Sequence, residues 1–285
     1  MSNQNHLEML VKSVFELKNL LLSFFHSSKS IGFVQTMGAL HEGHLRLIKR
    51  GSEENDWVVV SIFVNPTQFN NPEDLLLYPR TLDSDLELLK KHFNNCIVFF
   101  PEVDEIYPAN DDFKPVELGH LDQILEAKFR PGHFQGVVHV IHNLFEIIRP
   151  NKAYFGQKDF QQLAIIRFIT KHYGFPIDIV ACETYRESSG LAMSSRNMRL
   201  SDFEKREALI IWNTLNFVKD NRTSLSPSEL KEKAIRYFEN GTLKLEYLEL
   251  VDSENLMPVN DWCLPTICCI AAYCSDVRLI DNLLL

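Results

Sequence analysis

Short runs of apolar, often β-branched residues alternate with longer amphipathic segments over roughly the first 180 residues of the chain. The apolar runs predict strands at residues 31–34, 57–64, 97–100, 152–154 and 177–181. The spacing of apolar positions predicts helices at residues 45–53, 82–92, 137–148 and 160–173. Because the strands show no polar alternation, we expect helices on both faces of a mostly parallel sheet, with ligands at the strands' carboxyl ends.

The pattern changes after about residue 185. Two helices are predicted, each opened by a serine with a glutamate three positions later, at residues 201–218 and 226–238. Strands are predicted at residues 245–251 and 268–273. The chain therefore predicts an α/β domain over residues 1–184 and a smaller α+β domain over residues 185–285.

The charge and the composition narrow the class of protein. The chain has 285 residues and a formal net charge of −9, which argues against nucleic acid or an anionic membrane as a partner. The N-terminus lacks a secretory signal, and the apolar stretch at residues 17–25 is too short to span a bilayer. Six cysteines are present, four of them crowded into CLPTICCIAAYC without C-x-x-C spacing, which favours reduced, buried thiols. We expect a cytoplasmic protein.

Two histidines three residues apart follow the first long predicted strand. They lie in the stretch TMGALHEGH, residues 36–44, where His41 and His44 flank Gly43. A helix that starts near residue 42 places both imidazoles at its N-terminus, where unpaired N–H groups and the helix dipole favour an anion. The H-E-x-x-H zinc motif needs a spacing of four rather than three. The placement after a strand favours a phosphate-binding pair over ordinary helix-start residues.

Uncharged hydrogen-bonding residues follow the strand at residues 57–64. The stretch SIFVNPTQF places Asn65 and Gln68 at the carboxyl edge of the sheet, where they would suit a hydroxyl or a carboxylate. A polar turn around Pro66 explains the same residues equally well. This segment alone does not decide between the two interpretations.

Cations and hydroxyls lie in three later loops. Arg130 stands in FRPGHF, and Lys158 follows a predicted strand in YFGQKDFQQ, where it suits a phosphoryl oxygen. The loop LAMSSRN offers two hydroxyls and the Arg196 guanidinium, a set that matches triphosphate binding by a flap that closes on nucleotide. Each loop, taken alone, is also consistent with ordinary solvated residues. No G-x-S-x-G elbow surrounds the serines, so a serine hydrolase is excluded.

A second histidine pair does not indicate a metal site. His139 and His142 also stand three residues apart, but inside the predicted helix at 137–148. They have no cysteine or carboxylate at ligand spacing, so we interpret them as residues of the helix surface.

Together these motifs resemble the pantothenate synthetases, also called pantoate–β-alanine ligases. The resemblance covers nearly the whole chain, through TMGALHEGH, VSIFVNPTQF, YPRTLDSDL, RPGHF, YFGQKDFQQL, GLAMSSRN and RLIDN. It implies a Rossmann-like nucleotidylyltransferase domain with a smaller C-terminal lid domain, usually in a homodimer. It also implies a reaction with ATP and Mg²⁺ in which pantoate forms a pantoyl adenylate that β-alanine converts to pantothenate, with release of AMP and pyrophosphate.

The resemblance also implies roles for individual residues. The catalytic residues that act on the phosphates are His41, His44, Lys158 and Arg196. Contacts to ATP are completed by Met37, Gly156, Asp159, Met193, Ser194 and Ser195. Pantoate is held by Gln68 and Gln162, with Arg130 beside them as a cation that would also suit the triphosphate.

The resemblance also points to one carboxylate near the metal. Asp85 in YPRTLDSDL is the carboxylate that could assist Mg²⁺, directly or through water. Ser84 replaces an acidic residue that often precedes this position in the family, which weakens any metal ligand here. Gln35 stands where the family commonly has proline, without removing a group assigned to the chemistry.

Two other functions remain open at this point. Another H-x-G-H adenylyltransferase would join a nucleotide to a phosphate-bearing acceptor, although the uncharged Gln68 and Gln162 suit a small hydroxy acid better. A nucleotide-binding sensor that has lost catalysis is the second alternative. The presence of His41, His44 and Lys158 argues against it.

Overall fold

The computed structural model describes residues 10–285, which form two compact units. Unit 1 takes in the chain up to Glu117 together with Gly132–Gly156 and Ile165–Cys182. Unit 2 consists of Leu118–Pro131, Gln157–Ala164 and Glu183–Leu285. Two short segments that precede the predicted boundary at residue 184 thus lie in unit 2. Both carry candidate site residues.

Unit 1 is built on a six-stranded parallel sheet with the order β1-β4-β3-β2-β5-β6. The strands are β1 (Leu10–Val11), β2 (Ile31–Thr36), β3 (Trp57–Ile62), β4 (Cys96–Phe99), β5 (Lys152–Gly156) and β6 (Asp178–Cys182). The chain runs outward from β2 to β3 and β4, then returns to place β5 on the other side of β2. This reversal is the switch point at which open α/β sheets bind ligands, and it confirms the predicted fold class.

Helices cover both faces of the parallel sheet. On one face, α2 (Glu42–Glu54) and α4 (Leu82–His92) contribute Leu45, Ile48 and Leu89 to a core with alternate residues of the strands. On the opposite face lie α1 (Val14–His26) and α7 (His133–Ile148). There Phe145 of α7 packs edge-on against Phe33 of β2, and Phe24 of α1 stacks on Trp57 of β3. Burial of each such side chain contributes about 1.5–3 kcal/mol, which explains why the strands are almost wholly apolar.

Short helices connect these elements. Unit 1 contains η1 (Pro66–Gln68), α3 (Pro72–Leu76) and α5 (Val103–Ile106). Unit 2 contains η2 (Gly119–Asp122) and α6 (Leu125–Phe129), which come from the segment between α5 and α7. The helix α8 (Phe160–His172) begins in unit 2 and ends in unit 1.

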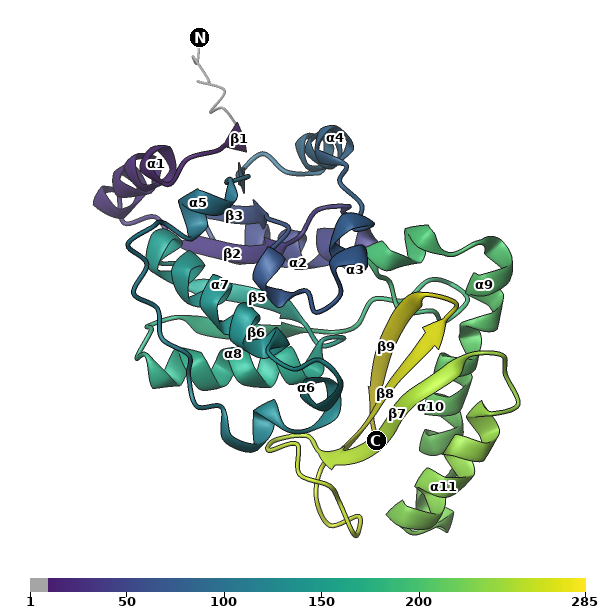
Figure 1. Cartoon of the computed structure of the whole chain (residues 1–285). Coiled ribbons are helices and arrows are strands. Elements are labelled where there is room, and N and C mark those ends of the chain that lie inside the picture. The colour runs from purple at the N-terminus through teal and green to yellow at the C-terminus, as the bar shows by residue number, and fades with distance from the viewer. Residues whose placement is uncertain (1–9) are drawn as a thin grey trace. The chain divides into compact units, whose positions relative to one another are not determined.

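Residues 183–285 of unit 2 form a three-stranded antiparallel sheet with the order β7-β8-β9, together with helices (Figure 1). Its strands are β7 (Lys244–Asp252), β8 (Thr266–Cys274) and β9 (Val277–Leu284). The helices are η3 (Ser195–Arg199), α9 (Asp202–Glu207), α10 (Leu209–Asn221), η4 (Arg222–Ser224) and α11 (Pro227–Phe238). Leu215 of α10 and Phe238 of α11 pack with Cys268 and Ile270 of β8 in one apolar core.

Several predicted elements differ in detail from the observed ones. The helix predicted at residues 201–218 is divided at Ala208 into α9 and α10, whereas both predicted capping boxes are present. The strand β9 was not predicted. The cysteines of the described chain are free thiols, and all are buried except Cys263. In the part of the chain that the structure describes, no helix is long and apolar enough to cross a membrane.

Candidate functional site

The loop between β2 and α2 adopts a strained backbone conformation. Gly38 and Ala39 both lie in the left-handed region, with φ of 81° and 48°. Glycine tolerates this geometry, but a residue with a Cβ incurs about 1–2 kcal/mol. The carboxylate of Asp85 offsets that strain, because it accepts hydrogen bonds from the backbone N–H of Ala39 at 2.9 Å and of Leu40 at 2.8 Å.

These hydrogen bonds bear on the prediction that Asp85 assists Mg²⁺. Its side chain is buried, and Thr81 also donates to it at 3.2 Å, so both carboxylate oxygens already act as acceptors. Burial raises the pKa of Asp85, while the two backbone N–H groups and Thr81 oppose that rise. Asp85 therefore holds the loop before α2, and its role toward Mg²⁺ stays a prediction. Over residues 10–285, no three His, Cys, Asp or Glu side chains are grouped to hold a metal ion.

The two histidines of TMGALHEGH form a stacked pair. His41 is the N-cap residue of α2, and His44 lies in the first turn, so their predicted placement at a helix N-terminus is confirmed. The ring centroids are 4.0 Å apart and the planes 22° from parallel, with both Nδ1 atoms buried. The helix N-terminus and two imidazole donors on one side make this a favourable place for phosphate oxygens.

The side chain of Asn65, which the sequence suggests could hold a hydroxyl or a carboxylate, instead forms hydrogen bonds with neighbouring residues of unit 1. Its side chain is fully buried and donates to the Gln68 Oε1 at 3.0 Å and to the Gly136 carbonyl at 3.2 Å. Its own oxygen accepts from the Tyr107 hydroxyl at 2.7 Å and from the backbone N–H of Thr67 at 3.2 Å. Asn65 therefore fixes the position of Gln68 rather than holding a ligand itself.

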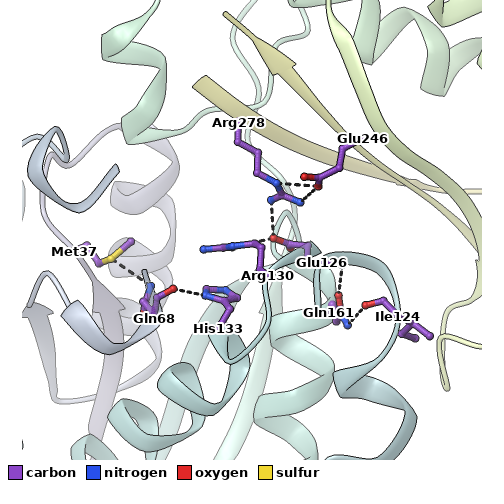
Figure 2. A network of polar contacts seen from close by, with 9 residues as sticks. All are labelled: Met37, Gln68, Ile124, Glu126, Arg130, His133, Gln161, Glu246 and Arg278. Atoms are coloured by element: carbon purple, nitrogen blue, oxygen red, sulfur yellow. Dashed lines mark hydrogen bonds and ion pairs between the residues drawn. The ribbon is translucent and has the colours of Figure 1, made fainter. Parts of the chain in front are cut away.

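Gln68 is held from a second side by His133, a residue to which the sequence assigned no role. The Gln68 carbonyl accepts a hydrogen bond of 2.7 Å from Nδ1 of the buried His133, which must carry the proton because a carbonyl only accepts. The Gln68 amide nitrogen lies 3.4 Å from the sulfur of Met37, a weak acceptor (Figure 2). The structure thus joins two predicted substrate-binding residues, Met37 and Gln68, at the carboxyl ends of β2 and β3.

A glycine of α7 makes this arrangement sterically tight. A Cβ added at Gly136 would lie 2.4 Å from the Thr67 carbonyl oxygen and 2.8 Å from the Gln68 backbone nitrogen. Gly136→Ala must therefore displace η1, and a shift of about 1 Å in a binding group costs up to about a hundredfold in rate. We expect Gly136→Ala to raise, by about tenfold, the KM for pantoate, which Gln68 is predicted to bind; steady-state kinetics measures this change.

The control for this prediction is Gly174→Ala. Gly174 has a φ of 68°, and an added Cβ there meets nothing within 4 Å, so the substitution strains the backbone without moving η1. Gly174→Ala should lower the melting temperature and leave KM unchanged. Equal KM values for wild type and Gly136→Ala would contradict the positioning role of Gly136.

Unit 2 holds the second group of candidate residues, beginning with Arg130. Arg130 directly follows α6, and its guanidinium pairs with Glu126 at 3.1 Å (Figure 2). Burial lowers the pKa of Arg130, Glu126 opposes this, and the nearby cations Arg278 and Arg196 lower it further. The structure thus brings Arg196, predicted to bind triphosphate, into the electrostatic range of Arg130.

Lys158, Asp159 and Gln162 lie at the start of α8, just past the end of β5 at Gly156. Each is partly buried. The neighbouring Gln161 is buried and has a structural task that the sequence did not reveal. Its amide nitrogen donates to the carbonyls of Leu121 and Ile124 at 2.8 and 2.9 Å, and its oxygen accepts from the Glu126 backbone N–H at 2.9 Å.

The segment with Met193, Ser194, Ser195 and Arg196 begins at a narrow hairpin and continues into η3. The Ser194 hydroxyl caps η3 by accepting from the Arg196 backbone N–H at 3.3 Å, and Ser195 is buried. Met193 donates its backbone N–H to the Tyr185 carbonyl at 3.0 Å, which closes the hairpin. These four predicted ATP-binding residues thus lie together on a short turn held by hydrogen bonds from backbone N–H groups.

The second histidine pair of the sequence lies in α7, within unit 1. His139 pairs with Asp111 at 2.6 Å and stacks on Phe113 with ring centroids 4.1 Å apart. His142 contacts the rings of Tyr173 and Phe175. Both lie on the surface of α7, as the sequence predicted, and are used in packing.

Relatives of the chain are numerous and similar over their full length. A model of the family described as pantoate-beta-alanine ligase matches residues 9–284. The pantothenate synthetase of Phocaeicola vulgatus is 48% identical over 281 residues, which cover 96% of this chain and 98% of the relative. That of Azobacteroides pseudotrichonymphae is 46% identical over 277 residues, with 96% and 99% covered.

Solved structures lead to the same family. The pantothenate synthetase of Thermus thermophilus is 38% identical with a TM-score of 0.89, over 96% of this chain and 98% of that one. A pantoate-beta-alanine ligase from Francisella tularensis, complexed with beta-gamma ATP and beta-alanine, is 36% identical with a TM-score of 0.80, over 97% of both chains. The chain described here belongs to the pantoate–β-alanine ligase family.

Proposed function

We propose that this chain condenses pantoate with β-alanine in an ATP-dependent reaction that yields pantothenate, AMP and pyrophosphate. The observation that carries the proposal is the stacked pair of His41 and His44 at the N-terminus of α2, in a chain that matches the ligase family over residues 9–284. The Francisella tularensis relative was solved with a form of ATP and with β-alanine, which supports both as substrates here.

In the first step, a carboxylate oxygen of pantoate attacks the α-phosphorus of ATP. The bond between the α-phosphorus and the bridging oxygen breaks, and pyrophosphate leaves with the electron pair. His41 and His44 stabilise the charge that develops on the α-phosphate, and Lys158 and Arg196 hold the departing pyrophosphate. Ser194 and Ser195 complete the phosphate contacts. The acceleration comes from positioning and preorganised charge, without a covalent enzyme intermediate.

In the second step, the amine of β-alanine attacks the acyl carbon of pantoyl adenylate. The bond from that carbon to the phosphate oxygen breaks, AMP leaves, and the amine loses a proton. Gln68 and Gln162, with Arg130, hold pantoate through its hydroxyls and carboxylate in the first step and the pantoyl group through its hydroxyls and acyl oxygen in the second. Gly156, Asp159, Met193 and Met37 receive the nucleotide. The stacking of the His41 and His44 rings supports the first step most directly, since two adjacent donors suit one phosphate group.

We propose Mg²⁺ as a companion of ATP rather than as a metal held by a protein cage. Mg²⁺ in such sites usually keeps several waters and binds through substrate phosphates with one or two carboxylates. The surroundings of Asp85 fit this picture, because that carboxylate is occupied by the backbone of residues 39 and 40. Mg²⁺ would neutralise phosphate charge, while the protein's part is to orient the triphosphate.

A homodimer, a cytoplasmic location and a lid function for the C-terminal domain are also proposals. Free thiols at all six cysteine positions are typical of a reducing compartment. Light scattering of the purified protein tests the dimer, which rests on family resemblance.

An ATP–pyrophosphate exchange assay tests the proposed function. We expect labelled pyrophosphate to enter ATP only when pantoate is present, because adenylate formation is reversible before β-alanine is added. Exchange supported equally by unrelated acceptors would favour a different H-x-G-H adenylyltransferase. Tight ATP binding without exchange would favour the nucleotide sensor.

A further inference from the structure

The strand β9 carries the segment RLIDN, residues 278–282, to which no role has yet been given. Its polar side chains are Arg278, Asp281 and Asn282, and each bonds to a different segment of unit 2. Arg278 and Asn282 project from one face of the strand and Asp281 from the other, because side chains alternate along a strand. All three segments that they contact carry, or directly adjoin, a proposed phosphate- or pantoate-binding residue.

Asn282 fixes the backbone that carries Lys158. It is buried, and its Nδ2 donates to the Gln157 carbonyl at 3.0 Å and to the Lys158 carbonyl at 2.9 Å. Both donors of the amide are thus used on consecutive peptide units at the N-terminus of α8. This contact determines where the Lys158 side chain leaves the main chain.

Arg278 holds the carboxylate that pairs with Arg130. Its Nη1 lies 2.9 Å from the Glu126 Oε2, the same oxygen that accepts from Arg130 at 3.1 Å (Figure 2). Its Nη2 lies 2.5 Å from Glu246 of β7. Burial disfavours the charged form of Arg278, but Glu126 and Glu246 outweigh it and raise its pKa. Glu126 is thereby locked between two guanidinium groups.

Asp281 anchors the hairpin that leads into Ser194–Arg196. It accepts from the Arg186 guanidinium in a fork, at 2.5 and 2.9 Å. Arg186 also donates to the Gly190 carbonyl at 3.2 Å and stacks on Trp212 at 3.8 Å from the ring centroid. Burial raises the pKa of Asp281, whereas Arg186, and more weakly Lys158, oppose that shift. The ammonium of Lys158 therefore lies within electrostatic reach of the same strand.

We infer that β9 is the element that aligns the anion-binding side chains of unit 2 with one another. One strand fixes the backbone at Lys158, the carboxylate beside Arg130 and the hairpin before Arg196, so these cations share one rigid support. Arg278, Asp281 and Asn282 are positioning residues that act through their neighbours, not groups that touch the substrate. The inference rests on the proposed function for the identity of the anion, the triphosphate of ATP.

The test uses the full chain with Asn282→Ala, and its readout is the Kd of ATP measured by isothermal titration calorimetry. Loss of both bonds to the 157 and 158 carbonyls should weaken ATP binding by about tenfold. The matched control is Asn240→Ala, because Asn240 also donates to two carbonyls, those of Arg236 and Tyr237, but at the exposed end of α11. The control should bind ATP with the wild-type Kd.

A second experiment, in which Asn282→Ala is combined with Lys158→Ala, distinguishes a positioning role of Asn282 from general destabilisation of the protein. If Asn282 acts through Lys158, adding Asn282→Ala to Lys158→Ala should change the ATP Kd by less than about twofold, since coupled residues are not additive. An equal loss of affinity in both backgrounds, or no loss in the wild-type background, would overturn the inference. Asn282→Ser replaces Asn282→Ala if thermal melting shows the latter unfolded at the assay temperature, because serine keeps a hydroxyl but cannot reach both carbonyls.

The binding readout keeps this inference separate from the proposed reaction. A wild-type chain that binds ATP but shows no pantoate-dependent exchange would contradict the proposed function and still report on β9. Normal exchange together with an unchanged ATP Kd in Asn282→Ala would contradict only the inference about β9.

Discussion

Replacing His44 with alanine is expected to lower the rate of adenylate formation by about a hundredfold or more. This is the usual scale for losing one preorganised donor to a developing charge, and it corresponds to about 2.7 kcal/mol in the activation barrier. His44 lies in the first turn of α2 and stacks on His41, so its loss removes a donor and the support of the neighbouring ring. The rate is measured by pantoate-dependent ATP–pyrophosphate exchange.

The matched control for His44→Ala is His92→Ala. His92 lies at the exposed C-terminal end of α4, in the same unit, and should give wild-type exchange. A glutamine at position 44, which keeps a neutral donor, should recover part of the activity. Wild-type turnover in purified, folded His44→Ala would refute the role assigned to this residue.

Lys158→Ala is the second substitution with a large expected effect, again about a hundredfold or more in kcat/KM for ATP. In the proposed reaction the flexible ammonium of Lys158 supplies a point charge to phosphoryl oxygens, and no other group at that backbone position replaces it. Asn282 holds the Lys158 carbonyl at 2.9 Å, so the backbone should remain in place when the side chain is removed. The loss then reports on the ammonium itself.

Two variants make the Lys158 prediction specific. Lys171→Ala removes an exposed lysine near the end of α8 and should leave the kinetics unchanged. Lys158→Arg keeps the charge but exchanges a compact ammonium for a planar guanidinium, so it should restore activity only in part. If Lys158→Ala and Lys171→Ala have the same kcat/KM, Lys158 does not bind the triphosphate.

Local patterns in the sequence were sufficient for strands β2 to β6 of the parallel sheet and for the placement of the histidines, whereas the two-residue strand β1 was not predicted. The apolar runs that became β2 to β5 are largely buried, so their sequence signal is strong. A strand followed by a glycine-containing turn and a helix start also placed His41 and His44 at the N-terminus of α2. The capping boxes at Ser201 and Ser226 are local as well, and both were found.

The parts that were missed depend on contacts between distant residues. Glu126 and Arg278 form an ion pair although 152 positions separate them, and a single sequence carries no signal of such a pair. In β9, polar Arg278, Asp281 and Asn282 interrupt the apolar pattern of a strand, because each bonds to another segment. The structural role of Asp85 was missed for the same reason, because its carboxylate bonds to backbone N–H groups that lie 45 and 46 positions away in the sequence.

Residues that lie close together in one motif also have different structural roles. In the QQ of YFGQKDFQQL, Gln161 is buried and bonded to three backbone groups, whereas Gln162 is partly exposed. In FVNPTQF, the buried Asn65 supports Gln68. The motif indicates that the segment belongs to the candidate site. Only the structure distinguishes the residue that supports the backbone from the residue that is a candidate for substrate binding.

The proposed reaction is best tested through the products formed when purified protein is mixed with ATP, pantoate, β-alanine and Mg²⁺. Mass spectrometry should detect pantothenate and AMP in equal amounts, and neither product when pantoate or β-alanine is omitted. Formation of ADP and phosphate instead of AMP, or AMP without pantothenate, would contradict the account.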